Sequence, residues 1–516
     1  MKTRTRLINL LSPLWIMSLV LLWSSCKTEF DSVPSSGALR FSSDTIYLDT
    51  IFDNIGSSTY TLKVYNDSDN NINIPQVGLA SGTGSNYRLN VDGQPGQSFS
   101  DVEILAKDSI FVFIETTVGD LGQNTQLLYE DQLLFDTGSN QQSVTLVTLV
   151  QEANFLFPEP LGNGIYETLD LGEDVVIDGF FLDDNELNWT ADKPWVIYGY
   201  AAIPPEKTLN IEPGARIHFH ENSGIIAANG ASIKAIGLPS ADPELMEGEI
   251  IFESDRLEPG FSDIPGQWGT IWLTAGSTDH EFTHVTIKNN LVGLLMDSND
   301  GDRTLTLKNV QIYNTATSGL LAQTGDVYGE NLVISNAGQS SLALTLGGRY
   351  RFVHSTFSNY WANSFRSRPA VQVTNALAIS DDEILVADLE QAEFVNCIIY
   401  GTEQREIGFY KEELGTYNVL FDHCLIKFED PLNTYADDPL YNFDDNTIYQ
   451  NLVLNEDPVF ENINLNDFDI SLEESAAVKR GSQAGASAVP VDLNGQTRPL
   501  NSPDLGAYQA ITFPEN

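Results

Sequence analysis

Four arginines lie close together among aromatic residues, in a chain that is otherwise strongly acidic. They are Arg349, Arg351, Arg366 and Arg368, and Trp361 is one of the aromatic residues between them. Planar guanidinium groups bind carboxylate or sulfate through paired hydrogen bonds, and aromatic faces stack on sugar rings. These residues therefore predict a ligand-binding site for an acidic glycan. The alternative is that the arginines neutralise carboxylates on neighbouring strands while the aromatic residues fill the core.

A second group of polar residues lies in a predicted loop, residues 255–268. It contains Arg256 and Asp263 and ends at Trp268. Polysaccharide lyases need a basic proton acceptor beside acidic residues, and loops on rigid scaffolds often carry function. Arg256 and Asp263 are therefore the candidate catalytic residues, and Trp268 is a candidate ligand-binding residue. The alternative is a packed loop in which Arg256 pairs with a carboxylate.

Residues 297–302 have the sequence DSNDGD and are similar to the first half of a calcium-binding loop. Lys308 stands where the loop needs an acidic ligand, so the EF-hand pattern fails and we expect a plain turn. The cysteines have no spacing typical of a zinc site. We expect no metal and no cofactor, with Ca²⁺ as the one candidate.

The charge balance excludes whole classes of partner. The chain has 72 acidic against 26 basic residues and a net charge of −46. Phosphate recognition needs a basic surface, so we expect no nucleic-acid partner. The hydrophobic content of 42% excludes a largely disordered acidic chain. A polysaccharide or a cell-envelope protein is the expected partner.

Six short segments between residues 281 and 427 share one pattern: His or Asn, a small or aliphatic residue, a variable position, then Ile or Phe. Their first residues are His284, Asn309, Asn331, His354, Asn396 and His423. Measured from Val285, the steps are 25, 22, 23, 42 and 27 residues. A β-rich period in the low twenties is typical of a solenoid with one coil per repeat. The long step predicts one coil with an inserted loop, roughly residues 374–391.

Polar residues at a repeated turn can hydrogen-bond along the stack. We therefore interpret the His/Asn column as a turn ladder, in which His284, His354 and His423 take the place of Asn. Cys397 and Cys424 occupy the same place in two neighbouring repeats. They could be stacked buried thiols or a disulfide.

Residues 39–152 have a different pattern, with period two. Tyr60, Leu62 and Val64 alternate with polar residues, and turn-forming clusters separate the predicted strands. The apolar run at residues 111–114 is typical of a central strand. The segment predicts an immunoglobulin-like β-sandwich that acts as a spacer or docking domain.

The N-terminus resembles a bacterial lipoprotein signal. Residues 1–25 have a basic start and an apolar run, and they end in two serines before Cys26. The resemblance implies that Cys26 is lipidated and that residues 26–38 form a tether. It also implies an outer-membrane lipoprotein, at the cell surface or the periplasmic face, that touches the membrane only through its lipid. The alternative is a signal anchor that is never cleaved.

Two further motifs carry a resemblance to secreted β-helix proteins. Residues 211–214, with the sequence IEPG, look like the turn in the first coils of right-handed parallel β-helices. Residues 492–508 contain DLNG, then Arg498 and DLGAY, and are similar to the C-terminal end of bacterial secreted β-helix proteins. The whole chain resembles the β-helix repeat lipoproteins of Bacteroidetes, with a pectin lyase-like fold.

The resemblance and the repeats together predict an all-β chain. We expect an immunoglobulin-like β-sandwich, a linker at residues 153–165, and a right-handed parallel β-helix at residues 166–511 with a C-terminal cap. The favoured function is non-catalytic binding of a glycan or a protein, or adhesion, on the cell envelope. The alternative is a polysaccharide-active enzyme, a lyase or a glycoside hydrolase, on the β-helix face.

Overall fold

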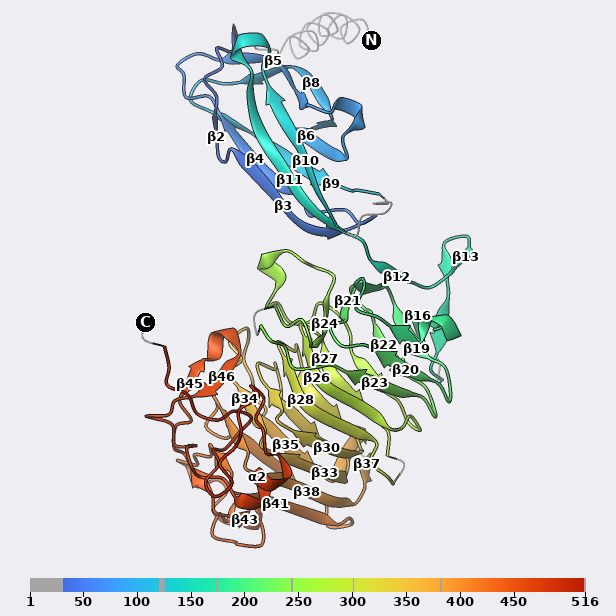
Figure 1. Cartoon of the computed structure of the whole chain (residues 1–516), viewed down its shortest axis with the longest axis vertical. Coiled ribbons are helices and arrows are strands. Elements are labelled where there is room, and N and C mark those ends of the chain that lie inside the picture. Colours follow the sequence, from blue (N-terminus) through green and yellow to red (C-terminus); the bar gives the residue numbers. More distant parts are fainter. Residues whose placement is uncertain are drawn as a thin grey trace, which may run out of the picture. The chain divides into compact units, whose positions relative to one another are not determined.

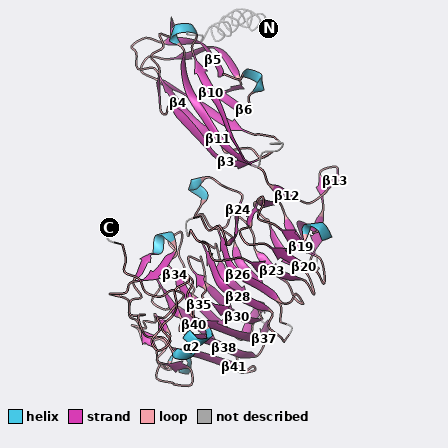
Figure 2. Cartoon of the chain, viewed as in Figure 1, coloured by secondary structure: helices cyan, strands magenta, loops and turns pink. Residues whose placement is uncertain are grey.

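The structure is a computed structural model that describes residues 31–119, 126–172, 175–242, 245–299, 301–380 and 383–514. Strands make up most of the regular structure in these residues (Figure 2). The chain divides into two compact units between Gln151 and Glu152. No helix among the described residues is long and apolar enough to cross a bilayer. The predicted signal peptide and the lipidation at Cys26 lie outside the described residues.

The first unit is a sandwich of two β-sheets (Figure 1). One sheet has the order β1 (Val33–Pro34), β5 (Ile72–Leu79), β10 (Gln126–Phe135), β11 (Gln142–Gln151) and β3 (Thr45–Phe52), with β8 (Ser98–Ile104) also on β5. The other has the order β2 (Arg40–Phe41), β4 (Tyr60–Tyr65), β9 (Ser109–Thr116), β6 (Tyr87–Val91) and β7 (Gln94–Gly96). Apolar residues from both sheets form a single core, so the predicted sandwich is confirmed.

Strand β9 is central in its sheet but is buried on one face only. Val112 and Ile114 are fully buried, whereas Phe111 and Phe113 are 46% and 38% exposed. Alternate side chains of a strand point to opposite faces, and the outer face of this antiparallel sheet is not covered by another layer of the first unit. The apolar run indicated the central position correctly but not the open face.

The second unit is a parallel β-helix (Figure 1). Its 19-stranded sheet contains β12 (Asn154–Leu156), β17 (Asn188–Trp189), β18 (Trp195–Ile197), β20 (Thr208–Ile211), β21 (Arg216–Phe219), β23 (Ser232–Ile236), β24 (Ile250–Ser254), β26 (His280–Lys288), β28 (Leu305–Tyr313), β30 (Asp326–Glu330), β31 (Val333–Ile334), β33 (Gly348–Val353), β34 (Thr356–Asn359), β38 (Leu389–Val395), β39 (Ile398–Gly401), β41 (Tyr417–Asp422), β42 (Leu425–Ile426), β43 (Tyr449–Gln450) and β44 (Val453–Leu454).

A separate 10-stranded sheet completes the coils. It contains β15 (Thr168–Asp170), β16 (Val176–Phe181), β19 (Tyr200–Ile203), β22 (Gly224–Ala227), β25 (Ile271–Leu273), β27 (Val292–Met296), β29 (Ser318–Ala322), β32 (Leu342–Leu344), β35 (Val371–Thr374) and β40 (Ile407–Tyr410). All of its pairings except β15–β16 are parallel, and a single aliphatic and aromatic core fills the coils. Each short strand is stabilised by its neighbours above and below, because stacking buries a continuous apolar column.

The segment predicted as a linker belongs in part to the β-helix. β12 pairs in parallel with β18, so Asn154–Leu156 is already a strand of the stack. The rest of that segment includes the hairpin of β13 (Pro160–Gly162) and β14 (Ile165–Tyr166). The prediction was wrong there because a three-residue strand has no sequence pattern of its own. The predicted insertion forms an antiparallel hairpin of β36 (Ala376–Ser380) and β37 (Glu383–Val386).

The six repeated His and Asn residues form the predicted turn ladder. All have a positive φ, between 48° and 56°, the left-handed conformation that Asn tolerates better than most residues. Asn331 Nδ2 donates to Asn309 Oδ1 at 2.8 Å, and Asn309 Nδ2 donates to His284 Nε2 at 3.2 Å. Asn396 Nδ2 likewise donates to His354 Nε2 at 2.9 Å. Three pairs of neighbouring turns are therefore joined by side-chain hydrogen bonds.

Cys397 and Cys424 are free, buried thiols. Cys397 Sγ donates to the carbonyl oxygen of Phe352 at 3.6 Å, and Cys424 Sγ donates to that of Phe394 at 3.3 Å. Burial, together with the neighbouring thiol, raises the pKa of Cys424 well above its ordinary value. Of the two alternatives left by the sequence, the structure has the stacked thiols.

The C-terminal segment folds back along the ladder as a cap. It contains β45 (Phe460–Asn462), β46 (Asp467–Ile470) and α2 (Gln483–Ala488). The Ser482 amide donates to Asn396 Oδ1 at 2.7 Å, and Asn331 Nδ2 donates to the Val491 carbonyl at 2.9 Å. The cap therefore covers the ladder turns from Asn396 back to Asn331.

Candidate functional site

Two of the four arginines predicted to bind a ligand are already paired with carboxylates. Arg349 and Arg351 lie on β33, and their guanidinium groups bond to Glu390 and Glu393 on the neighbouring strand β38. Arg349 also lies 3.8 Å from Asp326 on the other side. For Arg349 and Arg351, these contacts agree with the alternative interpretation, in which the arginines neutralise carboxylates of adjacent coils.

Arg366 is buried and cannot contact a ligand at the surface. Its side chain is 1% exposed and meets the fully buried Glu406. Burial raises the pKa of Glu406, while hydrogen bonds from Arg366 oppose that shift. An Arg366 N–H also donates to the carbonyl oxygen of Arg368 at 2.7 Å. Arg366 therefore holds a loop in place, and the prediction that it binds a ligand was wrong.

The predicted ligand residues do not form one cluster. Arg349 and Arg351 lie on a strand of the 19-stranded sheet, whereas Arg366 and Arg368 precede β35 of the 10-stranded sheet. Arg368 is exposed. Trp361 is partly buried, and its Nε1 donates to Ser364 Oγ at 2.9 Å. The four arginines were predicted to form one site because they are close in sequence. In the fold, the turn after β34 separates the first two from the last two.

The loop at residues 255–268 is packed by its own contacts. The Arg256 guanidinium bonds to the Glu258 carboxylate at 3.1 Å and lies 3.7 Å from the ring centre of Phe261. Asp263 accepts hydrogen bonds from Ser262 Oγ at 2.9 Å and from Asn314 Nδ2 at 3.3 Å. The structure therefore does not pair Arg256 with Asp263 as the predicted catalytic residues.

Trp268 lies in the core of the β-helix. It is 1% exposed and stacks on Phe219 with ring centres 4.2 Å apart. Its Nε1 donates to the Lys288 carbonyl at 2.9 Å, so the polar part of the indole is satisfied internally. The prediction of a ligand contact was wrong because Trp268 follows the loop and already packs inside the coil.

The predicted calcium-like turn also uses its side chains internally. Asp297 Oδ2 accepts a hydrogen bond from Trp272 Nε1 at 2.7 Å, and burial raises the pKa of Asp297. Asp300 lies outside the described residues. Within the described residues, no three His, Cys, Asp or Glu side chains are grouped as metal ligands would be.

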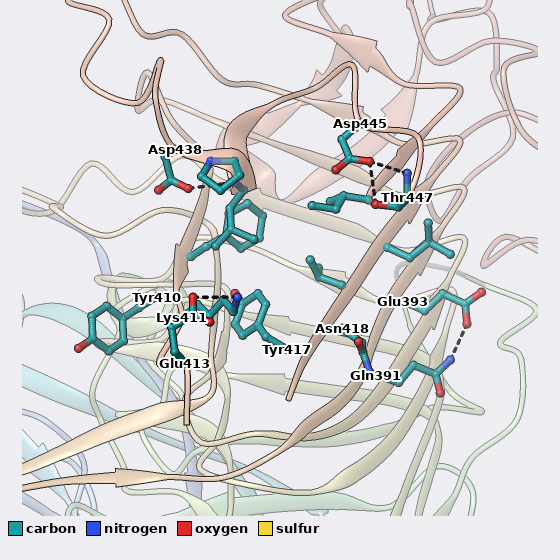
Figure 3. A pocket seen from close by; sticks show the side chains of 17 residues that line it. Gln391, Glu393, Tyr410, Lys411, Glu413, Tyr417, Asn418, Asp438, Asp445 and Thr447 are labelled. Atoms are coloured by element: carbon teal, nitrogen blue, oxygen red, sulfur yellow. Dashed lines mark hydrogen bonds and ion pairs between the residues drawn. The ribbon is translucent and has the colours of Figure 1, made fainter. Parts of the chain in front are cut away.

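A pocket that the sequence did not indicate lies on the outer surface of the last coils. This side pocket has a volume of about 880 Å³ (Figure 3). Its lining includes Gln391 and Glu393 on β38, Asn418 on β41, and Tyr410 at the end of β40. A loop at residues 438–448 forms the opposite wall.

Two carboxamides and a carboxylate line the sheet side of the side pocket. Gln391 Nε2 donates to Glu393 Oε2 at 2.7 Å, and Asn418 Nδ2 donates to the Glu390 carbonyl at 3.0 Å. Glu393 is further held by Arg351. Each carboxamide has two donors and an acceptor oxygen, so both retain hydrogen-bonding capacity. Tyr410, on the other side of the pocket in Figure 3, is 47% exposed and adds an aromatic ring to the lining.

The opposite wall is held by turns that use their own carboxylates. Asp438 Oδ1 accepts from the Leu440 amide at 2.9 Å, and Asp445 Oδ1 accepts from the amide and hydroxyl of Thr447 at 2.9 and 2.7 Å. The bonds from Thr447 lower the pKa of Asp445. Lys411 pairs with Glu413 at 3.0 Å. The ionisable groups of the lining are mainly acidic, which disfavours an anionic ligand.

Part of the side pocket could have been found from the sequence. Gln391 and Glu393 alternate with Ala392 and Phe394, the pattern of a strand with one face outward. That pattern identifies an outer face but not a hollow. The hollow depends on the long turn after β42, which has no repeat pattern and whose path is decided by its packing.

Among curated proteins, none matches the chain. A family 123 glycoside hydrolase from Clostridium perfringens matches at 8% identity and a TM-score of 0.17, over 23% of this chain and 30% of that one. A PapD-like domain of human CEP192 matches at 10% identity and a TM-score of 0.16, over 25% of this chain and 94% of that one. The E. coli chaperone DraB matches at 14% identity and a TM-score of 0.16, over 24% of this chain and 58% of that one.

These structural likenesses are too weak to support an argument about function. The family comparison is more informative about architecture, although it covers less than half of the chain. Together with the almost exclusively β architecture, it confirms the predicted fold class. Residues 292–453 match the model of the right-handed β-helix region.

Proposed function

We propose that this protein is a lipid-anchored cell-envelope β-helix protein that binds a neutral polysaccharide in its side pocket and does not cleave it. The observation that carries the proposal is that one hollow is lined by two outward carboxamides, Gln391 and Asn418, and by the exposed ring of Tyr410. Its volume of about 880 Å³ is within the usual range for small-molecule sites. Carboxamides hydrogen-bond sugar hydroxyls, and an aromatic face packs on a sugar ring.

A neutral polysaccharide suits the charges of the side pocket better than the acidic glycan suggested by the arginines. Carboxylates of Glu393, Asp438 and Asp445 line it, and Lys411 is neutralised by Glu413. Arg351 contacts the lining at Glu393, and its guanidinium group is already bonded to that carboxylate. An added anion would be repelled by Asp438 and Asp445.

The proposed anchor and location follow from the leader sequence. Lipidation of Cys26 would hold the protein to the outer membrane, as in the Bacteroidetes lipoproteins that the chain resembles. The β-sandwich would then act as a spacer or docking domain. The non-catalytic assignment is supported by the separation of Arg256, paired with Glu258, from Asp263, which bonds to Ser262 and Asn314.

The test is affinity electrophoresis of the chain, carrying Cys26→Ser, in gels that contain one polysaccharide each. Neutral β-glucan, xyloglucan and galactomannan would be compared with polygalacturonate. We expect retardation by at least one neutral polymer, and its loss in the double variant Gln391→Ala/Asn418→Ala. Phe365→Ala, at a residue that is 89% exposed and outside the pocket, is the matched control. Retardation by polygalacturonate alone, or an unaffected double variant, would overturn the proposal.

A further inference from the structure

A second cavity lies where the C-terminal cap stops covering the turn ladder. This cap groove has a volume of about 660 Å³. Ladder residues His284 and Asn309 line one side, and Asp469 of β46, Asn494 and Tyr508 of the cap line the other. The cap bonds to the ladder at Asn396 and Asn331 but leaves the two preceding turns open to this cavity.

Tyr508 is a buried polar side chain that lines the cap groove. It is 6% exposed, and within the described part of the chain its hydroxyl has no hydrogen-bond partner. Burial, and then the nearby carboxylates of Asp469 and Asp467, raise its pKa well above the ordinary value. The hydroxyl oxygen itself is not fully buried, and Tyr508 lines the groove. The hydroxyl is therefore available to a ligand in the groove.

Two carboxylates of the groove have unused hydrogen-bonding capacity. Glu249 accepts one long hydrogen bond, from Thr286 Oγ1 at 3.4 Å, and both oxygens of Asp469 accept from Asn494 Nδ2, at 2.9 and 3.2 Å. Burial raises the pKa of both, that of Asp469 to about 7, and the charge of Asp467 contributes to the shift of Asp469. A carboxylate has about four acceptor positions, so both can accept further donors.

The charged neighbours compensate this negative charge only in part, since Arg216 favours the charged form of Glu249 and Arg498 that of Asp492. Further acids around the groove are Glu330, Asp467 and Asp492. Arg216 lies near Glu249 but gives its hydrogen bonds to main-chain carbonyls. Arg498 donates to Asn331 and to the Ala507 carbonyl. Burial lowers the pKa of His284, which keeps its imidazole neutral.

We propose that the cap groove binds an amino sugar, with its ammonium group between Glu249 and Asp469 and its hydroxyls on Tyr508 and the neighbouring amides. A cation supplies the missing counter-charge, and charge-assisted bonds to carboxylates are the stronger kind. Asn309, Gln311 and Asn494 provide amide groups in the lining. A linear polyamine offers the same ammonium but no hydroxyls, so the hydroxyl partners favour the sugar. This site is separate from the side pocket and does not depend on it.

The experiment is isothermal titration calorimetry of the full chain carrying Cys26→Ser, at pH 7, with glucosamine. N-acetylglucosamine lacks the cation, glucose lacks the nitrogen, and putrescine lacks the hydroxyls. We expect glucosamine to bind at least tenfold more tightly than each of the three. Equal affinity for glucose or N-acetylglucosamine would overturn the ammonium site. Equal or tighter binding of putrescine would overturn the amino-sugar assignment.

Two variants locate the site. Glu249→Gln keeps the shape and removes a charge, and we expect it to weaken glucosamine binding about tenfold. Tyr508→Phe removes only the unpartnered hydroxyl and is expected to weaken binding about fivefold. Glu456→Gln, at an exposed residue that lines neither the cap groove nor the side pocket, is the matched control and should have unchanged affinity. Unchanged affinity in Glu249→Gln would overturn the proposal, even if Tyr508→Phe fails to fold.

Discussion

Arg366 and Glu406 form a two-point contact inside the second unit. Arg366 Nη1 lies 2.9 Å from Glu406 Oε2, and Arg366 Nη2 lies 2.7 Å from Glu406 Oε1. Glu406 Oε2 also accepts the amide of Ala370, which precedes β35, and Oε1 accepts the amide of Glu403. This ion pair therefore connects the loop before β35 to the following coil.

We predict that Arg366→Leu lowers the free energy of unfolding of the second unit by about 3–5 kcal/mol, because it leaves the Glu406 carboxylate buried and unpaired. Arg368→Ala, at an exposed residue, is the matched control and should change stability by less than about 0.5 kcal/mol. Urea denaturation followed by circular dichroism measures both. Equal stabilities for the two variants would contradict a structural role for Arg366.

Asn331 connects the turn ladder to the cap. It donates to Asn309 and Val491 and accepts from Arg498 Nη2 at 2.7 Å, with a φ of 51°. We predict that Asn331→Ala costs about 3 kcal/mol, from the lost hydrogen bonds and the left-handed backbone. Asn331→Gly should be about 1 kcal/mol less destabilised, because glycine adopts this φ freely. Thermal unfolding compares them, and an Ala variant as stable as the Gly variant would exclude the backbone contribution.

Trp268 is predicted to be a core residue without a role in glycan binding. Trp268→Ala should destabilise the second unit by about 3–5 kcal/mol, through lost burial and the cavity that remains. Below its unfolding temperature, the variant should migrate like the unsubstituted chain in gels that contain a neutral polysaccharide. Loss of retardation in a variant that is still folded would restore Trp268 as a ligand residue.

The raised pKa of Asp469 predicts that the stability of the second unit depends on pH. Its pKa is raised by burial, and then by Asp467, to about 7, so the folded state binds more protons than the unfolded chain between about pH 4 and pH 7. The free energy of unfolding should therefore fall as the pH rises through this window, by up to about 1.4 kcal/mol per pH unit. Asp469→Asn should lose this part of the dependence, whereas Asp444→Asn, at an exposed residue, should retain it. Identical pH profiles for the unsubstituted chain and Asp469→Asn would contradict this assignment.

The two thiols of the core are predicted to be unreactive in the folded protein. Cys397 and Cys424 are both fully buried, and the pKa of Cys424 is raised, so little thiolate is present. In a chain carrying Cys26→Ser, iodoacetamide should modify neither thiol before denaturation and both after it, as measured by mass spectrometry. Rapid modification of the native protein would indicate that the coils around these cysteines open.

The sequence by itself determined the architecture. A period in the low twenties requires coils that stack on their neighbours, and positions such as Asn309 and Asn331 tolerate the left-handed turn between two strands. These are local or nearest-neighbour properties, so they repeat visibly along the chain. The alternation of Tyr60, Leu62 and Val64 predicted the sandwich for the same reason.

Only the tertiary structure decided which surfaces are open. Trp268 and Arg366, which were predicted to bind a ligand, are buried in the structure. The side pocket and the cap groove lie at residues that form no recognisable sequence motif. The cap groove joins His284 and Glu249 to residues more than 180 positions later in the chain, such as Asp469. The sequence repeats do not determine where the C-terminal segment turns back or which charged groups form ion pairs. Those contacts depend on long-range packing and on the free energy of burying each polar group.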